Sequence, residues 1–161
     1  MKKNFGKQTY LYPMPVFIIA TYDENGKADI MNAAWGGTYD TNKISICIDP
    51  SHKTAENLKL KKAFTVSMAD AAHVAACDYV GIVSGNKEPS KLEKSGFTVT
   101  KSEFVDAPVI NELPMCLECS VISYDDSTGA MVADIVNVSA EESVLTDGKI
   151  DPAKMEPITY D

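Results

Sequence analysis

The sequence has no long hydrophobic run and no excess of basic residues. Near the N-terminus the apolar stretch covers only residues 16–20 and follows two prolines. A membrane helix needs about 20 apolar residues, so we expect neither a membrane span nor a signal peptide. Lys and Arg total 15 against 23 acidic residues, for a formal charge of -8, and the basic residues form no long cluster. Nucleic acid is therefore not an expected partner.

Cysteine is also scarce, with four residues in a chain without an export signal, which predicts reduced thiols and a cytoplasmic protein. Cys116 and Cys119 have the spacing of half a zinc site. On a strand, however, residues three apart face opposite sides, and no second Cys or His pair has matching spacing, so we expect no metal. Cys47 and Cys77 are predicted as small apolar core residues.

The common glycine-rich nucleotide motifs are missing too. The chain contains neither G-x-G-x-x-G nor G-x-x-x-x-G-K-[ST], which argues against a Rossmann unit and a P-loop. With 161 residues, 45% of them hydrophobic and 24% charged, the composition is typical of one globular domain over residues 1–161.

Strand patterns dominate what is present. Residues 15–22 are β-branched and aromatic, Asn25-Gly26 is a tight-turn signal, and residues 28–34 return as the partner strand. Helical spacing is found only at residues 54–62 and 71–85. Because closure removes exposed strand edges, this pattern predicts a small barrel with a few short helices. Further strands are expected at residues 43–48 and 63–69, and residues 116–124 and 130–140 are expected to form a hairpin.

The stretch MNAAWGG, residues 31–37, holds the only tryptophan among small residues. A core tryptophan usually has large apolar neighbours. Small side chains instead expose backbone N–H and C=O groups that a flat ligand can approach, and Gly36 and Gly37 are expected to turn the chain away. The alternative is a strand that ends in a glycine turn and binds nothing.

The stretch DPSHKTAENL, residues 49–58, joins a strand to a helix. Thr54 is expected to cap the helix, whose first N–H groups attract anions. Ser51 and Thr54 add hydroxyl donors, and Lys53 adds a positive charge. The alternative is an ordinary capped helix with a solvated lysine. A phosphate at this helix start and a flat ring at the small-residue stretch together describe flavin mononucleotide (FMN).

Four segments carry a family resemblance: YPMPVFIIATYDENGKADIMNAAWGG, SHKTAENL, AFTVSMA and CDYVGIVSGNKEPSKLEKSGFT. They resemble the flavin reductase-like, FMN-binding split-barrel family, which includes flavoredoxin-type proteins. The resemblance implies a mainly β, Greek-key split β-barrel with a few short peripheral helices. It also implies a homodimer with one FMN per subunit near the interface. Members of this family commonly continue beyond the PITYD of residues 157–161.

The resemblance also transfers binding roles by position. The ring-lining segment of the family corresponds here to Asn32, Ala33, Ala34 and Trp35. Its phosphate loop corresponds to Ser51, His52, Lys53 and Thr54. A further loop corresponds to Asn86 and Lys87, and the resemblance implies that it lies near the flavin, either of the same subunit or of the partner subunit. His52 is either a phosphate donor or an exposed loop residue, and His73 is expected in a surface or capping role. Tyr79 and Phe97 are expected in the core, with a position at the edge of the cofactor as the alternative.

The expected mechanism needs no protein acid or base. Ala33 and Ala34 would admit the ring to the strand edge, where backbone N–H groups favour the negative charge that develops on reduction. Trp35 would form an apolar wall. We expect hydride transfer from NADH or NADPH, stacked on the exposed flavin face, followed by electron transfer to an acceptor. Two alternatives remain: a flavin-carrying electron-transfer protein fed by another redox protein, and a non-catalytic FMN-binding module.

Overall fold

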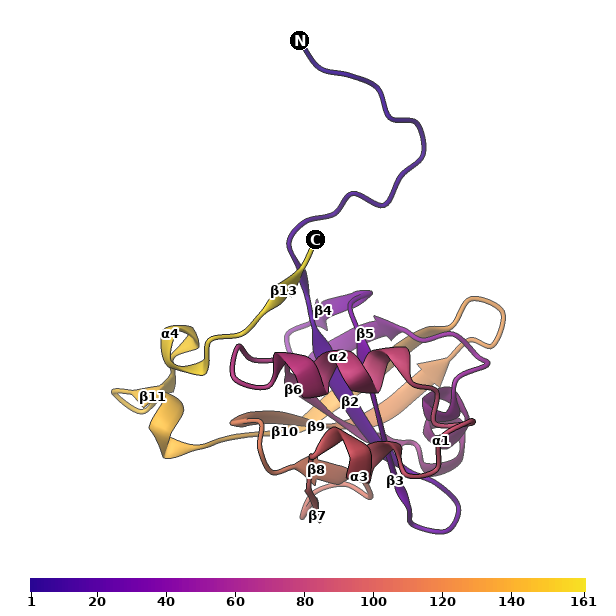
Figure 1. The fold of residues 1–161 in the computed structure, drawn as a ribbon, viewed down its shortest axis with the longest axis vertical. Coiled ribbons are helices and arrows are strands. Elements are labelled where there is room, and N and C mark those ends of the chain that lie inside the picture. Colours follow the sequence, from indigo (N-terminus) through magenta and orange to yellow (C-terminus); the bar gives the residue numbers. More distant parts are fainter.

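A curled antiparallel sheet forms the body of the computed structural model, which describes all residues 1–161. Its seven strands are β2 (Phe17–Tyr22), β3 (Ala28–Ala33), β4 (Gly36–Asp40), β5 (Lys43–Cys47), β6 (Ala63–Met68), β9 (Met115–Tyr124) and β10 (Ala130–Ala140). They lie in the order β3-β2-β6-β9-β10-β5-β4 (Figure 1). Residues 34 and 35 connect the two edge strands, β3 and β4, so the barrel is split there.

Three small strand pairs and four short α-helices surround this sheet. The pairs are β1 (Met14–Pro15) with β13 (Thr159–Tyr160), β7 (Val99–Lys101) with β8 (Pro108–Ile110), and β11 (Leu145–Thr146) with β12 (Lys149–Ile150). The helices are α1 (Lys53–Lys61), α2 (Val74–Ile82), α3 (Lys91–Ser95) and α4 (Pro152–Met155), with a 3₁₀ turn, η1, at Glu142–Val144. None of the helices combines the length and apolar content needed to cross a lipid bilayer. The predicted mainly β split barrel with short peripheral helices is confirmed.

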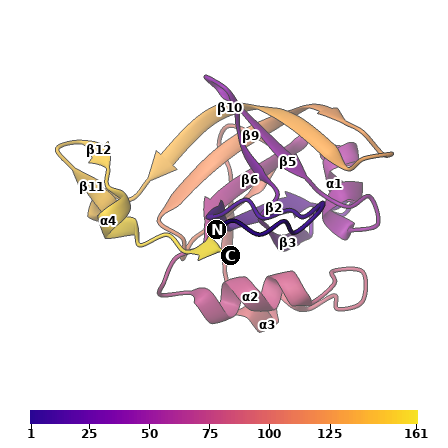
Figure 2. The same ribbon diagram turned by 90° about the horizontal axis from the view of Figure 1, so that it is seen from above.

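Strand β2 is buried on both faces, which explains its unbroken apolar sequence. Phe17 and Ile19 point into the curled sheet and join a core cluster that includes Phe64 and Met131. Residues on the opposite face join a second cluster with helix α2 and the β8 region. Figure 2 shows α2 and α3 together on the outer side of β2 and β3, so the second cluster lies between the helices and the sheet.

Two glycines let α2 and the loop after it approach β3 closely. A Cβ atom on Gly81 would overlap the side chain of Asn32, and one on Gly85 would overlap the carboxylate of Asp29. Since no larger residue fits at either position without displacing its neighbour, these glycines fix the gap between α2 and the edge of the sheet.

Several local expectations were wrong. Gly36 and Gly37 do not turn the chain away, because they begin β4, and a Cβ on Gly36 would lie 2.7 Å from the carbonyl oxygen of Ser45 on β5. Close strand packing, not turning, therefore requires a small residue at Gly36. Cys47 is exposed rather than in the core, since the alternation of β5 points Ile44 and Ile46 inward and Cys47 outward. The expected helices at 54–62 and 71–85 occur as α1 and the shorter α2.

Candidate functional site

Two adjacent cavities lie where the barrel is split. A polar cavity of about 400 Å³ borders the start of α1 and the loop after α2. An apolar cavity of about 560 Å³ follows the corner between β3 and β4. Met31, His52, Gly81 and Ile82 line both, so the two cavities share a wall and form one elongated site. Their volumes fall in the range usual for small-molecule sites.

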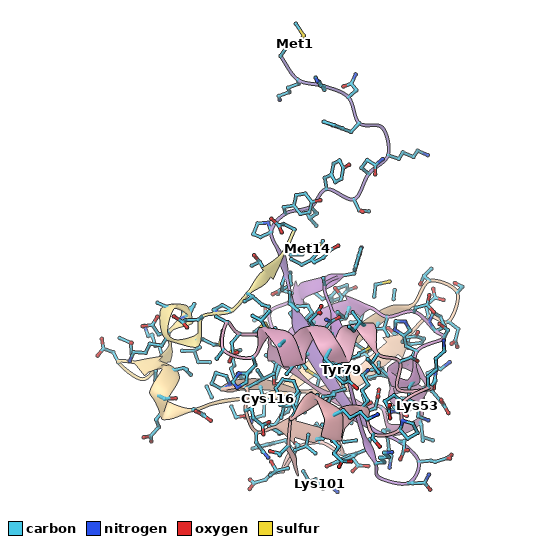
Figure 3. The ribbon with its side chains drawn as sticks, viewed as in Figure 1. Met1, Met14, Lys53, Tyr79, Lys101 and Cys116 are labelled. Carbon is cyan, nitrogen blue, oxygen red and sulfur yellow. The ribbon has the colours of Figure 1, made fainter.

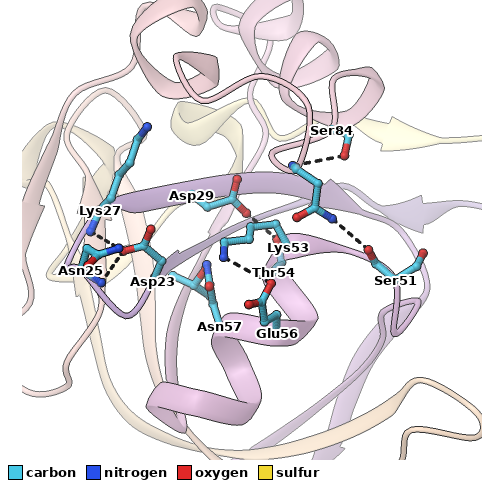
Figure 4. A network of polar contacts seen from close by, with 12 residues as sticks. Asp23, Asn25, Lys27, Asp29, Ser51, Lys53, Thr54, Glu56, Asn57 and Ser84 are labelled. Carbon is cyan, nitrogen blue, oxygen red and sulfur yellow. Dashed lines mark hydrogen bonds and ion pairs between the residues drawn. The ribbon is translucent and has the colours of Figure 1, made fainter.

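The polar cavity brings together two segments that are distant in sequence. Ser51, His52, Lys53 and Thr54 line it from the start of α1, while Asn86 and Lys87 line it from the loop after α2. The Asn86 side chain links the two segments, because its Nδ2 donates a hydrogen bond to the Ser51 carbonyl oxygen at 3.1 Å (Figure 4). The four residues predicted for the phosphate loop and the two predicted for a loop near the flavin thus lie around one space.

The start of α1 offers backbone donors more than hydroxyls. Thr54 is not the helix cap, because His52 occupies that position, and the Thr54 hydroxyl donates to Asp29 Oδ2 at 2.9 Å (Figure 4). The Ser51 hydroxyl likewise donates to Asp49 Oδ1 at 2.6 Å. The backbone N–H groups of Lys53 and Thr54 make no hydrogen bond within the chain. An anion at this helix start would therefore be met by unpaired N–H groups.

Lys91 is a site residue that the sequence analysis missed. It begins α3, is only 5% exposed and lines the polar cavity, and its ammonium group makes no hydrogen bond or ion pair. Burial lowers the pKa of Lys91, and the nearby Asp29 carboxylate opposes that shift. Lysine is almost never this buried without a charged partner. An unpaired ammonium in the wall of a cavity is suited to an anionic ligand.

Asp29 is the only acidic side chain that lines the polar cavity. Burial raises the pKa of this carboxyl, while Lys91, the Thr54 hydrogen bond and Lys53 oppose the shift. Lys53 also pairs with Glu56 on the outer side of α1, at 3.2 Å (Figure 4). With Lys53, Lys87 and Lys91 against one carboxylate, the polar cavity is positive inside an acidic protein.

The apolar cavity contains the other predicted segment. Asn32, Ala33, Ala34 and Trp35 all line it. Ala34 and Trp35 lie between β3 and β4, and their backbone N–H groups make no hydrogen bond within the chain. Trp35 is 53% exposed and its ring centroid lies 6.3 Å from that of Tyr160 on β13. The small-residue corner thus presents two unpaired donors beside an aromatic wall, an arrangement suited to a flat polar ring.

The loop before α1 is held by the β9–β10 hairpin. The Tyr124 hydroxyl donates to the Ile48 carbonyl oxygen at 2.7 Å, and the Ile48 N–H donates to the Gly129 carbonyl oxygen at 2.8 Å. A Cβ on Gly129 would lie 2.5 Å from that Ile48 oxygen, so only glycine allows this approach. These contacts fix the position of the loop that leads to the wall of the polar cavity.

The remaining candidate residues lie elsewhere. His73 precedes α2, where its Nδ1 lies 2.8 Å from Asp70 Oδ1, and it lines neither cavity. Phe97 is buried in the second core cluster and Tyr79 packs against it, as expected. Cys116 and Cys119 are buried on β9, and burial raises their pKa values to about 11 and about 12. No group of three or more His, Cys, Asp and Glu side chains is placed to hold a metal ion.

Comparison with known proteins shows the family. The family model described as "Flavin reductase like domain" matches residues 9–156. Flavoredoxin of Desulfovibrio vulgaris (Miyazaki F) is 35% identical, with a TM-score of 0.94 over 99% of this chain and 88% of that one. Flavoredoxin from Methanosarcina acetivorans is 30% identical, with a TM-score of 0.89 over 99% and 86%.

A more distant structure has the same fold. It is an FMN-binding domain of a flavin reductases-like enzyme from Shewanella baltica OS155, which is 20% identical, with a TM-score of 0.81 over 91% of this chain and 81% of that one. At this identity the likeness supports the architecture alone. Because the family model spans most of the chain and the flavoredoxin match exceeds 30% identity, this protein belongs to the flavin reductase-like family of FMN-binding split-barrel proteins.

Proposed function

We propose that this protein binds one FMN, with the phosphate in the polar cavity and the isoalloxazine ring in the apolar cavity. One observation carries the proposal: the polar cavity and the apolar cavity lie side by side. The polar cavity is positively charged, and each cavity has unpaired backbone N–H groups. FMN combines a phosphate dianion with a flat polar ring, so its two ends match the two cavities.

At the phosphate end, the N–H groups of Lys53 and Thr54 would bind the anion, and Lys53, Lys87 and Lys91 would neutralise it. His52 lines both cavities and would lie between the two ends of the ligand. Asn86 would act by holding Ser51 in place through the bond to its carbonyl oxygen. Charge-assisted bonds to a phosphate are stronger than neutral ones, so this end would supply much of the selectivity for FMN over riboflavin.

At the ring end, Ala33 and Ala34 would leave room for the tricyclic system, and the N–H groups of Ala34 and Trp35 would donate to its polar edge. Trp35 would exclude water from one side. When bound, FMN supplies hydride and electron transfer chemistry. Amide donors fixed at the ring edge favour the reduced, more negative form of such a ring and raise its reduction potential.

We further propose that NADH or NADPH reduces the bound flavin, which then passes electrons to an acceptor. Anaerobic addition of each nicotinamide to the flavin-loaded protein tests this step. Loss of the flavin absorbance, followed by its return when an acceptor is added, would support a reductase. An unchanged spectrum with both nicotinamides, together with reduction by dithionite, would contradict it.

A second candidate is an electron-transfer protein without nicotinamide activity. It is favoured by the identities of 35% and 30% to two flavoredoxins. In that case a separate redox protein would supply electrons to the bound flavin. Reduction by a ferredoxin but by neither nicotinamide would identify this function, whereas a spectrum that no donor changes would point to an FMN-binding module without redox work.

Two further proposals concern the setting of this function. We propose a homodimer, in which each subunit holds one FMN near the interface. We also propose a cytoplasmic location, which the four unpaired cysteines support. Sedimentation of the purified chain tests the first, and cell fractionation tests the second.

A further inference from the structure

We propose that residues 1–13 form an arm that packs on the cavity face of a second copy of this chain and covers the apolar cavity there. The inference rests on the proposed homodimer and names the segment that makes it. Figures 1 and 3 show the arm leaving the body at Met14 and extending away from the sheet to Met1. Every residue of this arm is exposed.

The arm carries large apolar side chains that its own subunit leaves in water. Phe5, Tyr10, Leu11 and Tyr12 are all more than half exposed. The aromatic rings lie near one another, with centroid distances of 5.9 Å for Phe5–Tyr10 and 6.0 Å for Tyr10–Tyr12. The only backbone hydrogen bond within the arm joins the Leu11 N–H to the Thr9 carbonyl oxygen. Such a segment gains stability only by burying these side chains on another surface.

A receiving surface lies on the same face of the molecule. An apolar groove of about 680 Å³ begins at Leu11 and Pro13, at the root of the arm, and runs across β4, β5 and β10. The exposed Tyr39 also lines it. This groove shares Ala34, Trp35 and Cys47 with the apolar cavity, so the two form one continuous apolar face. A segment lying along the groove would reach the open side of the cavity and shield Trp35.

Charge and reach favour a second copy as the occupant. The arm has Lys2, Lys3 and Lys7 and no acidic side chain, whereas the whole chain has a formal charge of -8. The arm is therefore attracted to the body of another copy. Extended, 13 residues span at most roughly 45 Å, compared with a radius of gyration of roughly 15 Å for a domain of this size. Because arm and groove are adjacent on one face, a twofold axis would let each arm lie on the other subunit.

Another apolar patch provides the matched control. Ile122, Val136 and Val138 are exposed on β9 and β10 and line neither the groove nor the apolar cavity. The test compares the wild-type chain, the double variant Leu11→Asp/Tyr12→Asp and the single variant Ile122→Asp by sedimentation at tens of micromolar. Circular dichroism of each variant confirms folding, since every substituted side chain is at least half exposed.

We expect a wild-type mass twice the 17.5 kDa of one chain, unchanged in Ile122→Asp. We expect the dimer dissociation constant of the double variant to rise by about 100-fold or more. Acrylamide quenching of Trp35, the only tryptophan, should increase in the double variant alone, measured without flavin. A monomeric wild type, a double variant that still dimerises with wild-type affinity, or dissociation caused by Ile122→Asp would overturn the inference.

FMN titration of the same three proteins separates this inference from the proposed function. A wild-type dimer that depends on the arm but binds no FMN would refute only the FMN proposal. A wild-type chain that binds FMN and remains monomeric would refute the arm and the proposed homodimer but not the FMN site.

Discussion

Replacing Lys91 by methionine tests the polar cavity, because it removes the buried charge and keeps most of the apolar stem. Lys91 lines the cavity, and its ammonium group has no ion-pair partner within the protein. Two unit charges about 8 Å apart in a medium of effective dielectric constant near 20 attract by roughly 2 kcal/mol. Loss of this attraction should weaken FMN binding by about 30-fold. Riboflavin has the same ring without the phosphate, so its affinity should not change.

The measurement is the ratio of the FMN and riboflavin dissociation constants, obtained from quenching of flavin fluorescence. Lys94→Met is the matched control, since Lys94 lies on the same helix, is exposed, and pairs with Glu88 at 2.6 Å outside the cavity. The control should leave both affinities unchanged. If Lys91→Met weakens FMN and riboflavin equally, or leaves FMN binding intact, Lys91 does not act on the phosphate and the placement of the anion is wrong.

Three other predictions follow from the same site. Ala34→Phe should abolish binding of both FMN and riboflavin by filling the corner between β3 and β4 while the circular dichroism spectrum is retained, and normal binding by a folded variant would contradict the ring placement. Asp29→Asn should tighten FMN binding several-fold by removing the only carboxylate of the polar cavity. Because burial raises the Asp29 pKa in the folded protein, the protonated carboxyl stabilises the fold. This stabilisation is fully present below the pKa of Asp29 in the unfolded chain and is lost as the pH rises through its pKa in the folded protein. Urea unfolding should therefore show the wild type losing stability relative to Asp29→Asn across that interval, and parallel pH curves would exclude the effect. The exposed Cys47 should react quickly with a disulfide reagent at pH 8 and be protected by FMN. The three buried thiols should react slowly, because burial raises their pKa values to about 11 or 12, and equal rates for all four would contradict this prediction.

The sequence predicted the strands and singled out the two segments that line the cavities because both depend on local patterns. Alternation and β-branched residues marked β2, β5 and β10, and Asn25-Gly26 marked the first hairpin. The small residues before Trp35 and the polar residues before α1 each signalled a place where backbone donors are left free. Their union into one site was expected from the shape of FMN, and the structure places the two cavities side by side.

Other features depend on tertiary contacts that no local pattern reveals. Lys91 looks like any surface lysine of a short charged helix, and only the packing of α3 against α2 and β3 buries it. Thr54 is a good capping residue by type, but the Asp29 carboxylate on β3 takes its hydroxyl. Gly36 suggested a turn by its residue type alone. The reason that a glycine is needed there is the Ser45 carbonyl on the neighbouring strand, which is distant in the sequence. The outward direction of Cys47, in contrast, follows from the alternation of β5, and only the fold shows that it lines the apolar cavity.

The central claim is that the split in this barrel holds FMN by both its phosphate and its ring. Titration of the flavin-free protein with FMN, followed by the quenching of Trp35 fluorescence, tests it most directly, because the single tryptophan lines the proposed ring cavity. We predict saturable quenching at one FMN per chain, with riboflavin binding more weakly. Trp35 emission that stays unchanged in excess FMN, in a folded protein, would contradict the central claim.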